Sequence, residues 1–550
     1  MHLNRMNGAM RRAAWIASLA AMVLVEVAGA AQPGDGRSEG NIPQLRKQGT
    51  AMQLVVDGNP FLIIGGELHN SSSSSLEYMK PIWQRMLDLH FNTVLAGVSW
   101  ELVEPEEGRF DFSLVDGLIQ DARRSGLRLV FLWFGSWKNG MSSYIPVWVK
   151  KDYTRFPRVR LQERGTVEVL STLAEANWRA DAKAFAALMR HIREVDGDSR
   201  TVIMVQVENE VGVLRDSRDR SGAANAAFVG PVPKALLDYL PKNRDALVPE
   251  IRKRWETAGF KASGAWAEVF GGGPETDEIF MAWQYARYVD NVAAAGKAQY
   301  GIPMYVNTWL SGQGKPGEWP SGGPLPHVMD MWLAGAPHID MLSPDIYAAD
   351  FERWCQRYTQ RSNPLFIPEM NRDGAGPQDV FLAFGQYSAI GTSPFAVDSM
   401  ENPKDSKLAR SYAVLEQIAP LILQYQGTGR MTGFLLNKEH PTVTRDLGDY
   451  QLEISLDDIF GYRADQGYGL IAAVGPNEFA GAGSGFRVSF RPKTPGAPLA
   501  AVGTVDEGIY REGKWIPGRR LNGDENDQGQ RWRFDSQRLS IERCTVYRYE

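Results

Sequence analysis

From residue 51 to about residue 400, short apolar runs alternate with amphipathic segments of helical period, and no other feature of the sequence limits the fold as strongly. In Ala180–Glu194, for example, Phe185, Leu188 and Ile192 fall on one helical face. This alternation is typical of βα units that build a parallel sheet. It predicts an α/β fold that closes into a (β/α)8 TIM barrel, while an open doubly wound sheet shares the same local pattern. The eight apolar runs lie at residues 61–64, 93–96, 127–133, 202–207, 304–306, 339–342, 365–367 and 395–397.

Polar and aromatic residues at the carboxyl ends of these runs favour the barrel over the open sheet. In barrel enzymes the carboxyl ends of all strands form one face, which carries the active site. Groups more than 300 positions apart in the sequence are therefore expected to converge in space. They are His69-Asn70, Trp100-Glu101, Trp137 to Asn139, Asn209-Glu210, Asn307 to Trp309, Asp345 to Tyr347, Glu369 and Asp398.

The N-terminal residues have the pattern of an export signal. Arg11 and Arg12 precede the apolar residues 13–25, and the small residues Ala28-Gly29-Ala30 follow. An apolar run of 13 residues is shorter than the roughly 20 residues that span a bilayer, although a membrane anchor is the alternative. We expect a signal peptide over residues 1–30, a flexible leader over 31–50, and a periplasmic or secreted protein.

The rest of the chain is expected to form two domains, a catalytic barrel over residues 51–426 and a smaller β-sandwich over 427–550. The second domain is predicted from alternating segments separated by Gly, Pro and Asp/Asn turns. Within the barrel, residues 211–300 are far longer than one βα unit needs. This insertion either shapes a pocket or is a surface embellishment.

Charge and cysteine content exclude several function classes. With 60 Lys and Arg against 65 Asp and Glu, the net charge is −5, which predicts no nucleic-acid partner. No later segment approaches the length of a membrane span. Two cysteines allow at most one disulfide, between Cys355 and Cys544, and there is no His-Glu-x-x-His or phosphate-binding glycine motif. We expect no cofactor and no metal, and the oligomeric state stays open, with a homo-oligomer as one option.

Two apolar strands end abruptly in a carboxylic acid, Glu210 after Val205-Gln206-Val207 and Glu369 after Leu365-Phe366-Ile367. Hydrolysis of a glycosidic bond requires such a pair, because one acid protonates the leaving oxygen while a carboxylate faces the oxocarbenium-like carbon. A separation of about 5–5.5 Å would give retention, and roughly 6.5–9.5 Å would give inversion. Glu208 competes with Glu210, since strand alternation places both on the same side.

Two segments carry a family resemblance. Val205 to Gly212 resembles the acid/base motif of glycoside hydrolase family 35, the β-galactosidases, and Trp100 to Phe112 resembles the family's Trp-x-x-x-Glu-Pro-x-x-Gly-x-Phe-Asp-Phe stretch. The resemblance covers residues 51–425 and implies that Glu210 is the proton donor and Glu369 the nucleophile. Leu68-His69-Asn70 and Trp137 to Asn139 depart from the family pattern, and with Tyr347 they make the chain also similar to family 42 β-galactosidases.

The resemblance and the expected strand ends together imply a retaining exo-β-galactosidase acting on an oligosaccharide or polysaccharide. A β-glucosidase, β-mannosidase, arabinosidase, endo-glycanase or non-catalytic carbohydrate-binding protein is the alternative. Each candidate sugar-binding residue also has a structural interpretation, such as a helix cap for the Asn, a satisfied strand-end histidine or core packing of the Trp rings. The candidates are Asn209, Tyr347, His69, Trp137, Asn139 and Trp309.

Overall fold

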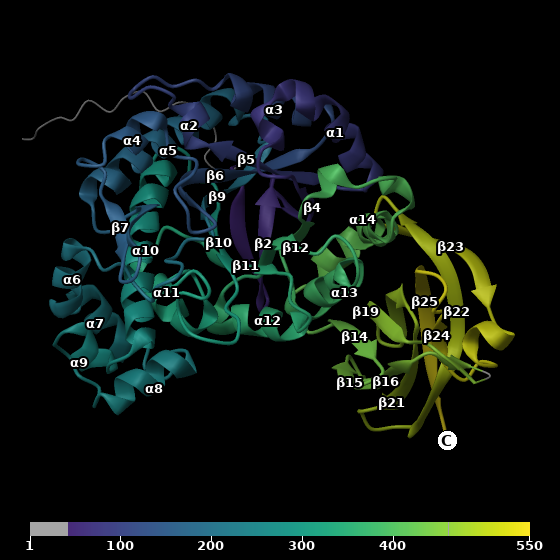
Figure 1. The fold of residues 1–550 in the computed structure, drawn as a ribbon. Helices are drawn as coiled ribbons and strands as arrows, with labels where there is room; N and C mark the ends of the chain where they lie inside the picture. Colours follow the sequence, from purple (N-terminus) through teal and green to yellow (C-terminus); the bar gives the residue numbers. More distant parts are fainter. Residues whose placement is uncertain (1–41, 460) are drawn as a thin grey trace, which may run out of the picture. The chain divides into compact units, whose positions relative to one another are not determined.

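The computed structural model describes residues 42–459 and 461–550, so the expected signal peptide and most of the expected leader lie outside the described residues. Eight parallel strands close into a barrel, which confirms the predicted fold (Figure 1). In ring order, β10 is followed by β11, β12, β13, β4, β5, β6 and β9. Their bounds are β4 (Ile63–Glu67), β5 (Thr93–Ser99), β6 (Arg128–Lys138), β9 (Val202–Asn209), β10 (Met304–Trp309), β11 (Met341–Ile346), β12 (Phe366–Met370) and β13 (Gly391–Pro394).

Amphipathic helices surround the barrel. In α5 (Glu175–Asp196) the predicted apolar face is fully buried at Phe185, Leu188 and Ile192. The Ser75 side chain caps α1 by accepting from the backbone N–H of Tyr78. The helices are α1 (Leu76–Asp88), α2 (Trp100–Val103), α3 (Ser113–Arg124), α4 (Val147–Lys151), α5, α10 (Pro274–Lys297), α11 (Met329–Gly335), α12 (Phe351–Tyr358), α13 (Gly376–Tyr387) and α14 (Lys407–Tyr425).

The last barrel strand differs from its prediction. The strand is the polar segment Gly391–Pro394, whereas the apolar residues 395–397 that were predicted to form it lie beyond its end. A Cβ on Gly391 would lie 2.4 Å from Cβ of Ile63, so β13 approaches β4 too closely for a larger side chain there. A search for apolar runs does not find this strand, because the close approach of β4 requires small side chains in it and not apolar ones.

The end of the expected leader is ordered, which corrects the prediction of a flexible segment up to residue 50. β1 (Gln44–Gln48) pairs antiparallel with β2 (Ala51–Val56), which pairs with β3 (Asn59–Phe61). Leu54 and Val56 belong to the same apolar cluster as barrel residues such as Val130. This small sheet therefore adds to the barrel core.

The long insertion forms four helices before α10, and they cluster together in Figure 1. They are α6 (Gly222–Val229), α7 (Lys234–Lys242), α8 (Pro249–Thr257) and α9 (Trp266–Phe270). A separate two-stranded sheet, β7 (Arg158–Leu161) and β8 (Gly165–Leu170), follows β6.

The C-terminal region is all β, as predicted. One sheet has the order β14, β19, β20, β25, β22, β23 and the other has β15, β16, β21, β24. An apolar cluster with Leu452 and Val488 from one sheet and Phe434 and Ile471 from the other fills the space between them. The strands are β14 (Met431–Asn437), β15 (Thr442–Leu447), β16 (Tyr450–Leu456), β17 (Asp458–Ile459), β18 (Tyr462–Arg463), β19 (Gln466–Gly475), β20 (Glu478–Ser484), β21 (Phe486–Pro492), β22 (Leu499–Arg511), β23 (Lys514–Leu521), β24 (Trp532–Phe534) and β25 (Ser540–Tyr549).

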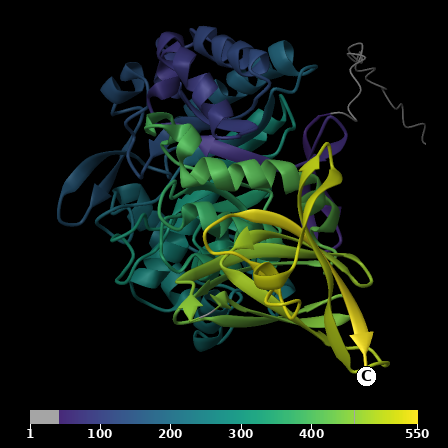
Figure 2. The same cartoon turned by 90° about the vertical axis from the view of Figure 1, so that its right-hand side faces the viewer.

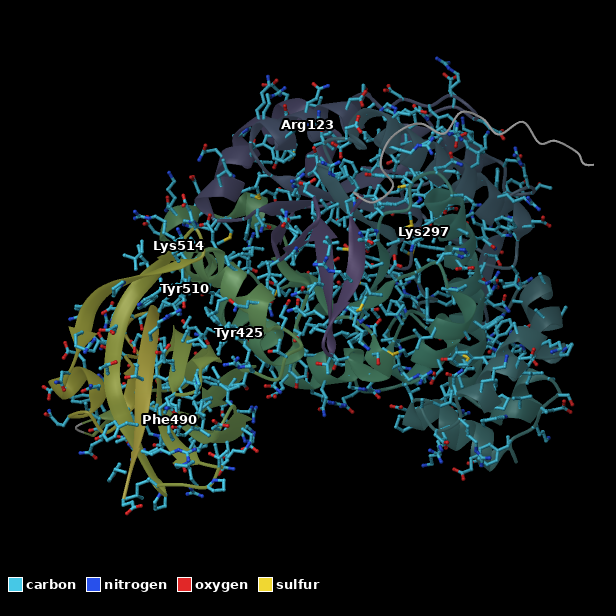
Figure 3. All side chains as sticks on the ribbon, turned by 180° about the vertical axis from the view of Figure 1, so that it is seen from behind. Arg123, Lys297, Tyr425, Phe490, Tyr510 and Lys514 are labelled. Carbon is cyan, nitrogen blue, oxygen red and sulfur yellow. The ribbon has the colours of Figure 1, made fainter. Side chains whose placement is uncertain are left out.

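The β region packs on helices of the barrel. Helix α14 contacts β22 and helix α13 contacts β14 and β19 (Figure 1). In Figure 2 the yellow strands of this region lie beside green helices of the barrel. Tyr510 of β22 and Tyr425 of α14, both labelled in Figure 3, belong to one apolar cluster with the barrel helices. Cys355 and Cys544 are both buried and form no disulfide. Among the described residues, no helix is long and apolar enough to cross a bilayer.

Candidate active site

A cleft of about 580 Å³ opens at the carboxyl ends of the barrel strands. Five of the eight residues predicted for the site line it, namely Glu210, Glu369, Asn139, Trp309 and Tyr347. The lining also includes Asn70, Lys138, Leu310, Ser311, Asp345, Ala348, Trp354 and Phe395.

Glu210 follows β9 and Glu369 lies in β12, and the barrel brings their carboxylates together across 159 positions of sequence. One oxygen of each lies within 4.8 Å of the other, and one oxygen of Asp345 lies within 4.8 Å of both. This upper limit is below the roughly 6.5–9.5 Å that leaves room for a water molecule in inverting glycosidases, and it suits the closer pair of retaining ones. The geometry favours direct attack by one carboxylate.

An irregular backbone at the end of β9 separates Glu210 from Glu208. Both residues adopt left-handed conformations, with φ of 45° and 63°. Such conformations cost of order 1–3 kcal/mol each for a residue with a side chain and break the alternation of a regular strand. Glu208 is therefore buried outside the cleft, where its carboxylate accepts a 2.8 Å hydrogen bond from the backbone N–H of Trp137. The sequence pattern had left these two acids unresolved.

Glu369 is held by three neutral donors. The Tyr347 hydroxyl donates to Oε2 at 2.8 Å, while the Asn307 and Asn209 amides donate to Oε1 at 3.3 Å and 3.5 Å. Hydrogen bonds of this kind stabilise and orient a charged carboxylate. The surroundings of Glu369 therefore suit a nucleophile.

Glu210 accepts fewer hydrogen bonds than Glu369, although the two residues are equally buried. Burial, followed by the nearby charge of Glu369, raises the pKa of Glu210 from 4.5 to about 8. The Asn139 amide donates to its Oε2 at 2.6 Å and opposes this rise. A carboxyl with such a pKa holds its proton at neutral pH, as a general acid must.

Two further acids share the site, and neither was among the predicted site residues. Asp345 accepts a 2.8 Å hydrogen bond from Asn307, and Glu67 is buried with both carboxyl oxygens unpartnered. Burial, and then the charge of Glu369, raises the pKa of both well above the usual range. Asp345 lies at a predicted strand end. Glu67 lies beyond the predicted strand at residues 61–64, whereas β4 extends to Glu67 and so carries this acid to the strand end.

Three predicted binding residues do not line the cleft. Asn209 is fully buried, and its amide donates to Glu369 at 3.5 Å. The His69 ring bonds to Asp398 at 2.9 Å, and the backbone N–H of His69 donates to the same carboxylate at 3.1 Å, so His69 fixes the loop after β4. Its neighbour Asn70 lines the cleft instead.

The prediction that Trp137 binds the sugar is wrong, because its ring lies in the protein interior. Its side chain is fully buried, its Nε1–H donates to the Leu170 carbonyl at 3.2 Å, and its ring packs against Tyr285 and Tyr288. The ring packs against helix α10 outside β6, so it supports the barrel wall and does not line the cleft.

The Glu-Pro motif after β5 is also structural. Glu104 is buried and accepts from Trp100 Nε1 at 2.9 Å and from the Gly108 backbone N–H at 2.7 Å. These bonds close the loop that follows the strand. The motif therefore forms no part of the cleft, because Glu104 is absent from the cleft lining and its bonds hold the loop together.

Comparison with known proteins agrees with the geometry. A family model described as β-galactosidase matches residues 70–270, and a model described as a domain of unknown function (DUF5597) matches residues 408–533. A β-galactosidase of Xanthomonas manihotis is 30% identical over 203 residues, which are 36% of this chain and 31% of that protein. The human β-galactosidase-1-like protein 3 is 40% identical over 60 residues, 11% of this chain and 9% of that protein.

Among solved structures, a β-galactosidase from Bacillus circulans sp. alkalophilus matches with a TM-score of 0.44 and 15% identity, over 66% of this chain and 57% of the other. The chain aligns with about a third of the length of its curated Xanthomonas relative. The resemblance to β-galactosidases that the motifs indicated is confirmed over residues 70–270, which contain the barrel strands β5, β6 and β9 and match the β-galactosidase family model.

Proposed function

We propose that this protein is a retaining exo-β-glycosidase that releases terminal β-galactosyl residues. One observation carries the proposal. Two carboxylates lie within 4.8 Å of each other at the carboxyl end of a barrel, and their surroundings differ, since Glu369 accepts three hydrogen bonds while the pKa of Glu210 is raised to about 8.

In the first step, Glu210 donates its proton to the glycosidic oxygen as the Glu369 carboxylate attacks the anomeric carbon. The bond from that carbon to the oxygen breaks, and the leaving group departs with the proton. The sugar is then esterified to Glu369 and Glu210 is a carboxylate.

In the second step, Glu210 removes a proton from water, which attacks the anomeric carbon and releases the sugar. The ester has no negative charge on Glu369, and that charge is one of the two main causes of the raised pKa of Glu210. The pKa of Glu210 therefore falls in the intermediate. The same residue can act first as an acid and then as a base.

Binding of a sugar ring is supported by two half-exposed aromatic rings in the cleft. Trp309 is 42% exposed and Tyr347 is 43% exposed, although both are large rings. Flat apolar faces with a polar edge suit the faces of a sugar ring. Galactose as the sugar rests on the similarity of residues 70–270 to β-galactosidases.

The test is hydrolysis of a panel of aryl glycosides by the full chain and its variants. We expect the β-galactoside to be the best substrate and Glu369→Gln to lower its rate by ~10³-fold or more. For Glu210→Ala, added azide should restore part of the rate and give a β-galactosyl azide. The exposed Glu106→Gln is the matched control. Full activity of Glu369→Gln contradicts the mechanism, and a preference for the β-glucoside contradicts the sugar assignment.

We also propose that the protein is exported. The proposal is supported by Arg11 and Arg12 followed by the apolar residues 13–25 and by Ala28-Gly29-Ala30. Mass spectrometry of the protein from periplasm and medium should give a chain that begins near residue 31. An intact N-terminus on cytoplasmic protein contradicts export.

A further inference from the structure

The insertion between β9 and β10 builds a second cavity beside the catalytic cleft. Its volume is about 720 Å³, within the roughly 300–1,000 Å³ of small-molecule sites. Ser311 lines both this cavity and the cleft, so the two spaces adjoin. We propose that this cavity, the aglycone pocket, binds the neutral oligosaccharide that carries the sugar to be removed. The inference rests on the proposed glycosidase function.

The position of the acid places the leaving group on this side of the cleft. A proton donor must face the glycosidic oxygen, so the aglycone lies near Glu210. Glu210 follows β9, which pairs with β10. The chain after β10 runs from Trp309 through Ser311, from the cleft into the aglycone pocket. An oligosaccharide leaving along this segment passes the half-exposed Trp309 ring.

The chemistry of the aglycone pocket suits a neutral, hydroxyl-rich ligand. Both oxygens of Glu278 are already bonded, one to Trp319 Nε1 at 2.8 Å and the other to His327 Nε2 at 2.7 Å. Two lining arginines have acidic partners in the pocket wall, Arg357 with Glu250 at 2.7 Å and Arg254 with Glu275 at 3.6 Å. The lining holds three acidic side chains, Glu250, Glu275 and Glu278, and three basic ones, Lys253, Arg254 and Arg357, so no strong field selects an ionic ligand. Exposed polar groups such as the Thr257 hydroxyl remain for sugar hydroxyls.

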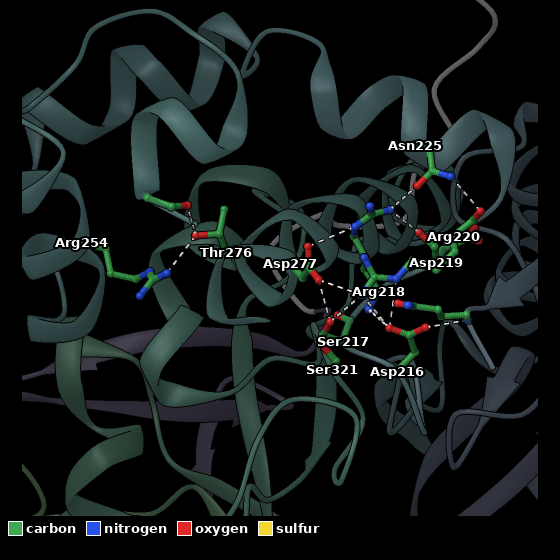
Figure 4. A network of polar contacts seen from close by, with 12 residues as sticks. Asp216, Ser217, Arg218, Asp219, Arg220, Asn225, Arg254, Thr276, Asp277 and Ser321 are labelled. Atoms are coloured by element: carbon green, nitrogen blue, oxygen red, sulfur yellow. Dashed lines mark hydrogen bonds and ion pairs between the residues drawn. The ribbon is translucent and has the colours of Figure 1, made fainter. Parts of the chain in front are cut away.

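The walls of the pocket are fixed by a polar network at the start of α10 (Figure 4). Arg254 Nη2 donates to the Gly272 carbonyl at 2.8 Å and to Thr276 Oγ1 at 3.0 Å. The next residue, Asp277, accepts from Arg218 at 3.0 Å and from Arg220 at 2.9 Å, which ties α10 to the loop after β9. A pre-formed site avoids part of the ordering cost of binding.

Gly272 offers a way to fill the pocket without touching the reacting carboxylates. A Cβ on Gly272 would meet no atom within 4 Å, and Gly222 in the same insertion is equally open but lines none of the pocket walls. In Gly272→Phe we expect the ratio of kcat/KM for a β-galactosylated tetrasaccharide to kcat/KM for an aryl β-galactoside to fall about tenfold. The matched control Gly222→Phe should leave this ratio unchanged. An unchanged ratio in Gly272→Phe overturns the inference.

A binding measurement separates this inference from the proposed catalysis. Calorimetric titration with cellotetraose, mannotetraose and xylotetraose, which lack galactose, should show that at least one binds the wild type and Gly222→Phe, with at least tenfold weaker binding to Gly272→Phe. Equal affinity for all three proteins, or no binding to the wild type, overturns the aglycone pocket. If a tetrasaccharide binds as expected but no aryl glycoside is cleaved, the pocket stands and the proposed catalytic function fails.

Discussion

At the scale of single residues, the site works by giving similar carboxyl groups different surroundings. Glu369 accepts hydrogen bonds from Tyr347, Asn307 and Asn209, whereas Glu210 is buried beside the charge of Glu369. Burial disfavours the charged form of an acid, and hydrogen-bond donors favour it. The proposed division into acid and nucleophile therefore rests on neighbours that lie far apart in the sequence.

The first prediction concerns the pH dependence of activity. Glu210 must be protonated to act as an acid, so kcat/KM should fall as the pH rises through about 8. The Asn139 amide favours the charged form of Glu210, and its removal should raise the pKa further. In Asn139→Gly, which suits the left-handed φ of 53°, we expect the alkaline limb of the kcat/KM profile to move up by roughly 0.5–1 pH unit.

Asn402→Gly is the matched control, because Asn402 has a similar φ of 46° and lies outside the cleft lining. Its profile should coincide with that of the wild type. A limb in Asn139→Gly that stays in place or moves to lower pH contradicts the role of this amide.

The second prediction concerns stability. Because the pKa of Glu210 is raised on folding from 4.5 to about 8, its ionisation destabilises the folded state progressively as the pH rises through this window. The penalty is absent below about 4.5 and complete above about 8. Glu210→Gln should raise the free energy of unfolding at pH 8 by at least about 1 kcal/mol and leave it unchanged at pH 4. Urea unfolding at both pH values measures this; an equal difference at the two pH values contradicts the prediction.

At the scale of elements, two close contacts at glycine residues fix the positions of β13 and α13. β13 is a strand of small residues because a Cβ on Gly391 would collide with Ile63. Helix α13 meets β14 in the same way, since a Cβ on Gly385 would lie 2.7 Å from Cα of Gly433. Neither contact has a hydrophobic pattern that marks it in the sequence.

The third prediction tests the contact between α13 and β14. Alanine is about 1 kcal/mol better than glycine inside an isolated helix, so a local effect alone would stabilise Gly385→Ala. The backbone of Gly433 leaves no space for the methyl group, and we expect Tm to fall by a few degrees instead. Gly222→Ala in α6, with open space around it, is the control and should not lower Tm. A rise in Tm for Gly385→Ala would show that the two elements separate easily.

At the scale of the whole molecule, the barrel and the C-terminal β region share apolar packing. Leu470 and Ile541 of the β region belong to the same buried cluster as Phe381 and Leu415 of helices α13 and α14. The ring of Phe381 also lies 5.5 Å from that of Tyr468. The β region therefore covers apolar surface of the barrel helices.

The fourth prediction follows from this shared core. A chain that ends at residue 426 should expose the apolar faces of α13 and α14, and we expect it to aggregate or to bind a hydrophobic dye. The full chain should unfold in one transition when followed by tryptophan fluorescence and by circular dichroism. A soluble truncated chain with the Tm of the full protein contradicts this dependence.

The sequence by itself determined the barrel, the all-β C-terminal region and the two strand-end acids, because apolar periodicity and strand ends are local signals. Seven of the eight apolar runs overlap a barrel strand, and the eighth, at residues 395–397, begins just after β13 ends. Only the tertiary structure decided that Glu208 turns away, that Trp137 is buried in the wall, and that Asp345 and Glu67 lie near Glu210 and Glu369. These outcomes depend on left-handed backbone conformations, side-chain direction and burial, which are set by residues distant in the sequence.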